Sequence, residues 1–342
     1  MLKKLKKLLI TTSLLVFLIP TTAFAFEQTG YFNKYRDYAT GSLNNVTGYT
    51  AMEGMCIDRV TNTIYSAKLN NKTKDVILLY KKIGDGGGFA QLKNNSGARF
   101  KGSDLGHAND ITAVNSGTTT SLYIAPIEGK YENKIIKLNA NSSGYTFSKA
   151  YTVKYNGTIL NKGFSGITYY KTVNGKQEFI VKVGPYCYIG TFDDSNNTLN
   201  CTRGFSLNYK LTSSDVITQG DKDIDFTNYI GQGICYYNNK IYIPLAKPSE
   251  GNSKLPSNVS IVLAYNLNDN TVNNSVRSNI KNDLFFRITS GPKAYGEKFE
   301  IEGIDFDNSG KLYFNTNRDG ALGAIDSVSI FTDTDGNPYI GK

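Results

Sequence analysis

The segment Glu-Gly-Ile-Asp-Phe at residues 302–306 has a pattern that recurs along the chain. A polar residue is followed by a small, an aliphatic, a small or polar, and an apolar residue. The same five-residue pattern, here called the pentad, occurs at 53–57, 109–113, 165–169 and 232–236. The pentad starts are 56, 56, 67 and 70 residues apart. Such spacing is typical of a repeat architecture.

Each pentad is followed by a turn and a second apolar segment, such as NTIYSAKL at 62–69. A third segment comes next, as in DVILLYKK at 75–82, and an outer fourth segment is represented by 145–155. Runs rich in β-branched and aromatic residues between polar turns indicate strands. Five units of four antiparallel strands predict an all-β protein, a five-bladed β-propeller. An open β-solenoid or a pair of sandwiches is the alternative.

Closure of the ring can be achieved in two ways. Residues 28–40 precede the first pentad and could supply the outer strand of the last blade. Alternatively, the terminal hairpin that contains residues 337–341 supplies that strand locally. Residues 26–342 are expected to form a single propeller domain and a monomer.

Residues 1–25 have the pattern of a signal peptide. Lysines at its start precede an apolar run at 8–19, and Ala-Phe-Ala at 23–25 fits a cleavage site. The sequence therefore predicts a secreted protein with no transmembrane segment after cleavage. The signal segment holds four lysines and no acid, so its removal lowers the formal net charge from +9 to +5. Without a basic stripe, nucleic acid is not an expected partner.

Four cysteines occur in this exported chain, where disulfides are permitted. Cys187 and Cys201 flank a polar turn, so we expect them to face each other across a hairpin and form a disulfide. Cys56 and Cys235 occupy the same pentad position in blades that are not neighbours. We therefore expect both to be buried thiols.

The first pentad position is polar in all five repeats and should form a ring at one end of the central channel. These candidate ligand-binding residues are Glu53, Asn109, Ser165, Gln232 and Glu302. A polar residue that merely caps a loop is the alternative explanation. An amide-and-carboxylate ring suits sugar hydroxyls, and Glu53, Asn109 and Glu302 are also candidate ligands for calcium.

Glu53 and Glu302 belong to the first and last blades, which become neighbours when the ring closes. Paired carboxylates support general acid–base chemistry. His107, the single histidine, lies just before the second pentad and is a candidate base, although a loop role is the alternative. Asp110 could add an oxygen ligand, and Arg318 could reach the channel from a turn. One histidine and no Cys-x-x-Cys exclude zinc fingers and multi-histidine metal centres.

Gly-His-Ala-Asn-Asp-Ile-Thr at 106–112, with the segments 302–305 and 311–314, resembles secreted proteins of the helveticin J-like family. Those are bacteriocin-type proteins of Gram-positive bacteria. The resemblance implies a propeller with an antibacterial or envelope-binding role, and it supplies no catalytic residues. The Glu-Gly strand starts are also similar to those of calcium-activated nucleotidases and other five-bladed hydrolases.

The sequence thus favours a secreted protein that binds an envelope glycan or surface receptor, with bacteriocin activity, over an enzyme. The alternative is a calcium-supported glycosidase, lactonase or phosphohydrolase that uses Glu53, Glu302 and His107. A purely structural adhesion role is a third hypothesis. Fold alone does not choose between them.

Overall fold

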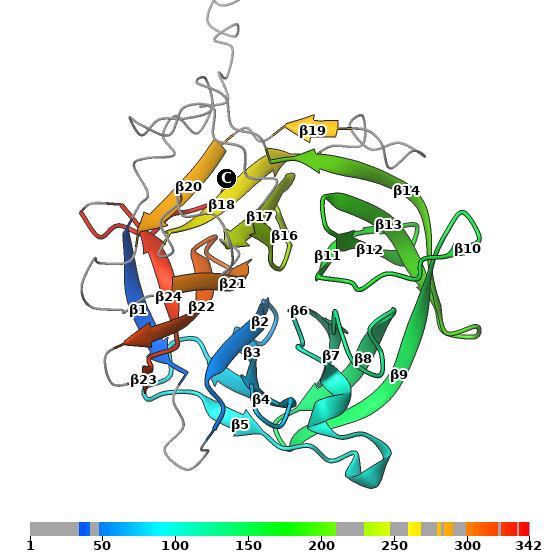
Figure 1. Cartoon of the computed structure of the whole chain (residues 1–342), viewed down its shortest axis with the longest axis horizontal. Helices are drawn as coiled ribbons and strands as arrows, with labels where there is room; N and C mark the ends of the chain where they lie inside the picture. Colours follow the sequence, from blue (N-terminus) through cyan, green and yellow to red (C-terminus); the bar gives the residue numbers. More distant parts are fainter. Residues whose placement is uncertain are drawn as a thin grey trace, which may run out of the picture.

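A computed structural model describes residues 34–41, 48–209, 229–246, 259–267, 279–281, 284–289, 299–320, 323–333 and 335–341. The expected signal peptide lies outside these residues. The described chain forms five blades arranged in a ring around a central axis (Figure 1). The expected five-bladed propeller is confirmed.

Each of the first three blades is a four-stranded antiparallel sheet, numbered from the axis outwards. Blade 1 contains β2 (Ala51–Asp58), β3 (Thr63–Asn70), β4 (Asp75–Lys82) and β5 (Ala90–Leu92). Blade 2 contains β6 (Asp110–Ser116), β7 (Thr119–Ala125), β8 (Lys134–Asn141) and β9 (Gly144–Tyr155). Blade 3 contains β11 (Gly166–Val173), β12 (Lys176–Val183), β13 (Tyr186–Asp193) and β14 (Thr198–Asn208).

The last two blades follow the same plan. Blade 4 contains β16 (Cys235–Tyr237), β17 (Lys240–Ala246), β18 (Val259–Asn266) and β20 (Leu284–Thr289). Blade 5 contains β21 (Phe299–Phe306), β22 (Leu312–Gly320), β24 (Ser327–Thr332) and, from the other end of the chain, β1 (Lys34–Thr40). Short additions are the 3-10 turns η1 (Gly97–Arg99) and η2 (Gly102–Leu105) and the strands β10 (Thr158–Ile159), β15 (Ile230–Gly231), β19 (Asn279–Lys281) and β23 (Gly323–Ala324). Among the described residues, no helix is long and apolar enough to cross a membrane.

Five apolar layers hold the ring together, one between each pair of neighbouring blades. The layer between blades 1 and 2 contains Leu78 and Leu138, and the layer between blades 5 and 1 contains Met55 and Ile330. Side chains alternate between the two faces of a strand, so every blade contributes to two layers. Each fully buried aliphatic side chain stabilises the fold by roughly 2 kcal/mol.

Ring closure uses the N-terminal strand. β1 pairs antiparallel with β24, so residues from both ends of the chain build blade 5 (Figure 1). The ion pair Arg318–Asp37, at 2.7 Å, fastens β1 to β22, and Asp37 also accepts hydrogen bonds from Ser327 and Ser329. Of the two expected closures, the first is therefore observed, and the C-terminal segment adds isolated bridges between Thr332 and Pro338 and between Lys311 and Ile340.

Hydrogen bonds between blades line the axis. In three blades, those with Thr112, Thr168 and Asp305, the fourth pentad position accepts from the backbone N–H at the fifth position of the next blade. Thr112 Oγ1 accepts from Tyr169 at 3.1 Å, and Asp305 Oδ2 accepts from Ile57 at 2.8 Å. This repeated bond explains why the fourth position is small or polar: it pairs backbone groups that burial would leave unsatisfied.

The expected Cys187–Cys201 disulfide is wrong. Both residues are buried free thiols, and in the β13–β14 pairing Cys201 lies opposite Gly190, three residues from Cys187. Because an odd offset reverses the face of a strand, Cys187 packs between blades 3 and 4 and Cys201 between blades 2 and 3. Cys56 and Cys235 are buried thiols as well.

Thiol titration checks this arrangement. Because all four cysteines are buried and unpaired, we expect no reaction of the native protein with a thiol reagent and four thiols per chain in denaturant without reductant. Two thiols in denaturant would instead indicate a disulfide and contradict the packing of Cys187 and Cys201 on opposite faces.

Candidate functional site

The five polar residues that open the pentads lie at one end of the central axis, the end at which the innermost strands begin. Four of them are buried, and Gln232 is partly exposed. Asn109 Nδ2 donates to the carbonyl oxygen of Ser165 at 2.8 Å, which ties blade 2 to blade 3. The ring therefore forms part of a dense polar network.

Glu53 and Glu302 occupy equivalent places in neighbouring blades. The β2–β3 register shifts between Met52 and Met55, and the β21–β22 register shifts between Ile301 and Ile304. Each glutamate, with the glycine that follows it, thus forms a β-bulge. A bulge bends the strand and re-aims its side chain, and bulges are common beside active sites. Both glutamates are nearly buried, with exposed fractions of 6% and 3%.

Glycine after each glutamate allows the two innermost strands to approach closely. A Cβ at Gly303 would lie 2.6 Å from the backbone nitrogen of Met55. Any side chain at this position would therefore force β21 away from β2. Gly54 meets blade 2 in the same way, since a Cβ there would lie 2.5 Å from the Cα of Asp110. In both blades the glycine after the glutamate is therefore explained by the approach of the next blade.

Asn315, on β22, fixes the two bulges relative to each other. Its Oδ1 accepts from the Gly303 N–H at 2.7 Å, and its Nδ2 donates to the Glu53 carbonyl oxygen. Nδ2 also donates to Ser66 Oγ at 2.9 Å. The side chain is fully buried, so one amide sets the spacing of both glutamates.

Replacement of Asn315 tests this coupling. We expect Asn315→Ala to lower the free energy of unfolding by about 2 kcal/mol, because buried backbone groups of both bulges lose their partner. Denaturant unfolding followed by circular dichroism measures the change. Asn200→Ala, at an exposed amide of β14, is the matched control and should change stability little. Equal stability of the two variants would contradict the coupling.

A buried ion pair closes the junction of blades 1 and 5 beside the glutamates. Lys68 Nζ lies 3.1 Å from Asp326 Oδ2 and donates to the Gly41 carbonyl oxygen at 2.9 Å. Asp326 also accepts from the backbone N–H of Arg318. Burial of an ion pair is costly unless further hydrogen bonds satisfy both groups, as they do here.

Lys182 lies on the far side of the ring and is also fully buried. Its Nζ donates to Ser165 Oγ at 2.8 Å and to the Gly231 carbonyl oxygen at 2.9 Å. Burial lowers the pKa of Lys182 to about 8, although the nearby Asp110 opposes the shift. A serine hydroxyl bonded to a lysine that deprotonates near neutral pH can act as a nucleophile with its base.

The lowered pKa predicts a pH dependence of stability. In the unfolded chain Lys182 keeps its proton to about pH 10.4, whereas the folded protein releases it near pH 8. Between these values the unfolded state binds more protons, so stability rises with pH. We expect the wild-type chain to gain about 2–3 kcal/mol relative to Lys182→Met over this interval, measured by denaturant unfolding. A constant difference between the two proteins would contradict the shift.

Asp110 fills the axis below the ring. Its Oδ2 accepts from the backbone N–H groups of Ile167 at 2.8 Å and Ile234 at 2.9 Å, and its Oδ1 accepts from Ile111 at 3.0 Å. Burial raises the pKa of Asp110, while these bonds and Lys182 act in the opposite direction. One carboxyl group therefore joins three blades and is not free to bind a ligand.

His107 and Arg318 do not join the ring. His107 Nε2 lies 2.9 Å from Glu128 Oε1 in a loop that is partly exposed, and burial lowers its pKa. Arg318 is 3% exposed and is engaged by Asp37 and Ser327 in the ring closure. The structure thus gives His107 a partner in its own loop and makes Arg318 part of the ring closure.

The calcium expectation finds little support in the donor set. In the part of the chain that the structure describes, no group of three or more His, Cys, Asp or Glu side chains is placed to hold a metal ion. Of the candidate ligands, Asn109 donates through Nδ2 to Ser165, which orients its amide but leaves open the oxygen that a calcium ion would use.

Sequence reasoning missed Lys68, Lys182, Asn315 and Asp326. A signal was present for the lysines, because each stands inside an apolar second strand of its blade. Lysine is almost never fully buried without partners, so a lysine at such a position indicates a polar network. Nothing comparable in the sequence marks Asn315 or Asp326.

Comparison with known proteins gives structural neighbours only. No protein-family model matches the chain, and no curated protein matches its sequence. The GH43 endo-arabinanase of Bacillus licheniformis has a TM-score of 0.46 at 11% identity and covers 86% of this chain and 98% of its own. RS223 β-xylosidase has a TM-score of 0.47 at 9% identity, with coverage of 90% and 98%.

A third neighbour is CoXyl43, a GH43 β-xylosidase/α-arabinofuranosidase from a compost metagenome, solved with xylotriose in a calcium-free form. Its TM-score is 0.46 at 11% identity, with coverage of 90% and 98%. Scores below 0.5 at such identity do not transfer an activity. The chemistry of this chain has to follow from its own residues.

These findings correct the expected identity and function. The neighbours are glycoside hydrolases, and no match supports the helveticin J-like resemblance. The short motifs that suggested it include pentads at 109–113 and 302–306, which are general to these blades. The preference for a bacteriocin-type binding protein over an enzyme, and for an antimicrobial role, is therefore wrong.

Proposed function

We propose that this chain is a glycoside hydrolase whose reacting groups are the carboxyls of Glu53 and Glu302. The observation that carries the proposal is their equivalent placement. Both lie in β-bulges of neighbouring innermost strands, both are nearly buried, and one buried asparagine bonds to both bulges. Structural roles alone do not require two matched carboxyl groups at the end of the axis.

Hydrolysis of a glycoside needs two carboxyl groups in different protonation states. One carboxylic acid protonates the oxygen of the departing group, and the other carboxylate attacks the anomeric carbon or deprotonates the attacking water. Two carboxyl groups in a dry site ionise at different pH values, because the first negative charge opposes the second. Glu53 and Glu302 can supply this pair, and the contacts of Asn315 hold both in place before substrate arrives.

A neutral glycan is the substrate class that suits the ring. Beside the two glutamates, Asn109, Ser165 and Gln232 contribute only uncharged polar groups. Such groups bind hydroxyls without favouring an ionic substrate. The signal segment supports a location outside the cell, where polymeric glycans are accessible.

Release of reducing sugar from arabinan, xylan and β-1,3-galactan tests the activity. We expect the wild-type protein to cleave one of these polymers and the Glu53→Gln/Glu302→Gln double variant to have no measurable turnover. Circular dichroism checks that the double variant is folded. Failure of the wild-type protein on every polymer, or equal turnover by the double variant, would contradict the proposal.

Ester or lactone hydrolysis is a second candidate, favoured by the 2.8 Å contact between Lys182 Nζ and Ser165 Oγ. Neutral Lys182 would take the hydroxyl proton as Oγ bonds to the carbonyl carbon, and would return it to the departing alkoxide; water then releases the acyl group. Turnover of 4-nitrophenyl acetate that is lost in Ser165→Ala and unaffected in Glu302→Gln would support this chemistry. Turnover that persists in Ser165→Ala would exclude it.

A further inference from the structure

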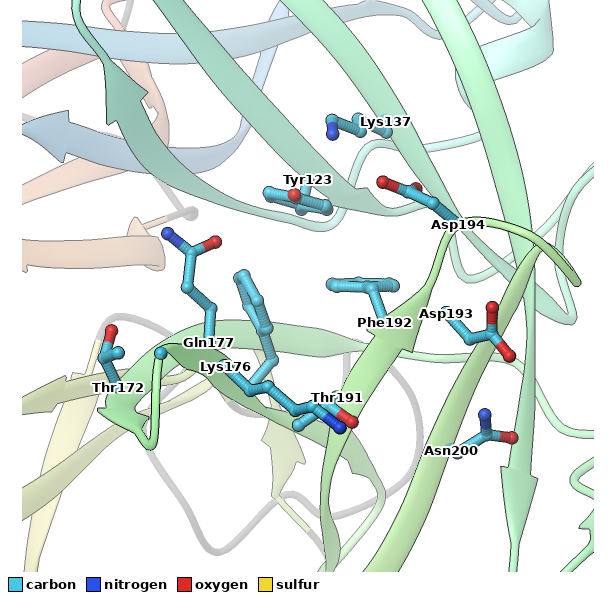
Figure 2. A pocket seen from close by; sticks show the side chains of 12 residues that line it. Tyr123, Lys137, Thr172, Lys176, Gln177, Thr191, Phe192, Asp193, Asp194 and Asn200 are labelled. Carbon is cyan, nitrogen blue, oxygen red and sulfur yellow. The ribbon is translucent and has the colours of Figure 1, made fainter.

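A hollow of about 620 Å³ lies between blades 2 and 3 (Figure 2). Its floor is a cluster of three aromatic rings from β7, β12 and β13. The rings of Tyr123 and Phe192 stack 4.7 Å apart at 16°, and Phe179 packs against both at 4.8 Å. Tyr123 and Phe179 are buried, whereas Phe192, which also packs against Tyr151 at 4.3 Å, is partly exposed and lines the hollow.

The rim of the hollow carries balanced charge. Lys137, Lys176, Asp193 and Asp194 line it, and Lys137 lies beside Asp194 in Figure 2. Two positive and two negative side chains thus line the hollow, and Asp194 is also ion-paired with Lys149 at 3.2 Å. The rim has no excess of negative or positive lining groups that would select an ionic ligand. Uncharged polar groups complete the lining, namely the side chains of Thr172, Gln177, Thr191 and Asn200.

Contacts outside the hollow fix the two carboxylates. Asp193 accepts from the backbone of Ser195 at 3.0 Å and from Asn196 Nδ2 at 2.8 Å, and the Asn196 bond is the main reason that its pKa is lowered. Asp194 accepts from the Tyr151 hydroxyl at 2.5 Å, which lowers the pKa of that carboxyl as well. Both acceptors are thus ionised and positioned before any ligand arrives.

The amides on the rim are available for a ligand. Gln177 and Asn200 line the hollow, and both residues are exposed. Gln177 also lines a second hollow of about 280 Å³, together with Arg59 and Asp305. This hollow lies at the end of the axis where the innermost strands finish. The two hollows meet at the Gln177 side chain, so an extended ligand could occupy both.

This region is separate from the paired glutamates. Glu53 begins the pentad on β2, whereas Asp58, which lines the second hollow, ends that strand. At about 3.3 Å per residue, Glu53 and Asp58 are roughly 16 Å apart along the strand. A molecule held here would therefore not touch the groups that carry the proposed hydrolysis.

We propose that the hollow between blades 2 and 3 is a second binding site, for a neutral oligosaccharide. A sugar ring presents C–H groups on its face and hydroxyls at its edge. The Phe192 ring suits the face, while the fixed carboxylates and exposed amides suit the edge hydroxyls. The volume is in the range of small-molecule sites, and the balanced charge argues against ionic ligands.

Affinity electrophoresis of the uncleaving Glu53→Gln/Glu302→Gln protein tests the proposal, with arabinan, xylan, β-1,3-galactan or anionic polygalacturonate in the gel. We expect at least one neutral polymer to retard the protein. Phe192→Ala should weaken this binding about tenfold, because a stacked aromatic face is lost. Gln177→Ala, a rim change that leaves the aromatic floor intact, should weaken it as well.

Tyr186→Ala is the matched control, because Tyr186 is an exposed aromatic residue of blade 3 outside the hollow. It should bind like its parent. Retardation by polygalacturonate alone, or by no polymer, would overturn the proposal. So would Phe192→Ala and Gln177→Ala variants that are retarded as strongly as their parent. The parent protein lacks both glutamates, so this experiment measures binding alone. Its result does not depend on whether the wild-type protein hydrolyses a glycan.

Discussion

Glu53→Gln and Glu302→Gln, made singly, are expected to lower kcat on a neutral glycan by about 10²–10⁴-fold while the propeller remains folded. Glutamine preserves the volume of the side chain and removes its ability to ionise or to donate a carboxyl proton. The backbone contacts of Asn315 with both bulges are unchanged by either substitution. Steady-state kinetics, with circular dichroism for folding, measures both quantities.

Leaving-group dependence distinguishes the two roles. A variant that lacks the general acid should recover most of its rate on a 4-nitrophenyl glycoside, whose departing group needs no proton. A variant that lacks the other carboxylate should remain slow on both substrates. Glu128→Gln, at a half-exposed glutamate paired with His107, is the matched control and should react at the wild-type rate. Full activity of either axial variant would remove that glutamate from the mechanism.

The propeller could be predicted because five pentads repeat one physical requirement. Each innermost strand needs a small residue where the next blade approaches and an apolar residue that packs against the previous blade. Gly54 shows the first requirement, since a Cβ there would lie 2.5 Å from the Cα of Asp110 in the next blade. Ile304, which joins the layer between blades 4 and 5, shows the second. Such local constraints are visible as a pattern in the sequence.

The site could be predicted only in part. The polar first position identified Glu53 and Glu302, but no feature of the pentad shows that their strands bulge there and not in blade 2 or 3. The expected disulfide failed because the sequence places Cys187 and Cys201 in paired strands without giving the register that puts them on opposite faces. Long-range partners such as Asn315, 262 positions from Glu53, are set by ring closure.

Removal of the Asp110 carboxyl is expected to give the largest loss of stability. Asp110→Ala leaves the buried N–H groups of Ile111, Ile167 and Ile234 without an acceptor. At about 1–3 kcal/mol for each orphaned group, reduced by the desolvation that a buried carboxyl no longer suffers, the net loss is about 3 kcal/mol. Asp110→Asn retains one oxygen for two of these groups and should lose about half as much.

Thr112→Val supplies the scale for this measurement, because Thr112 accepts a single bond, from Tyr169, on the same axis. Its expected loss is about 1 kcal/mol in denaturant unfolding followed by circular dichroism, a suitable probe for a chain without tryptophan. If Asp110 joins three blades through its oxygens, the loss of stability should be largest in Asp110→Ala, smaller in Asp110→Asn and smallest in Thr112→Val. If Asp110→Ala were no less stable than Thr112→Val, the apolar layers alone would hold blades 2, 3 and 4 in register.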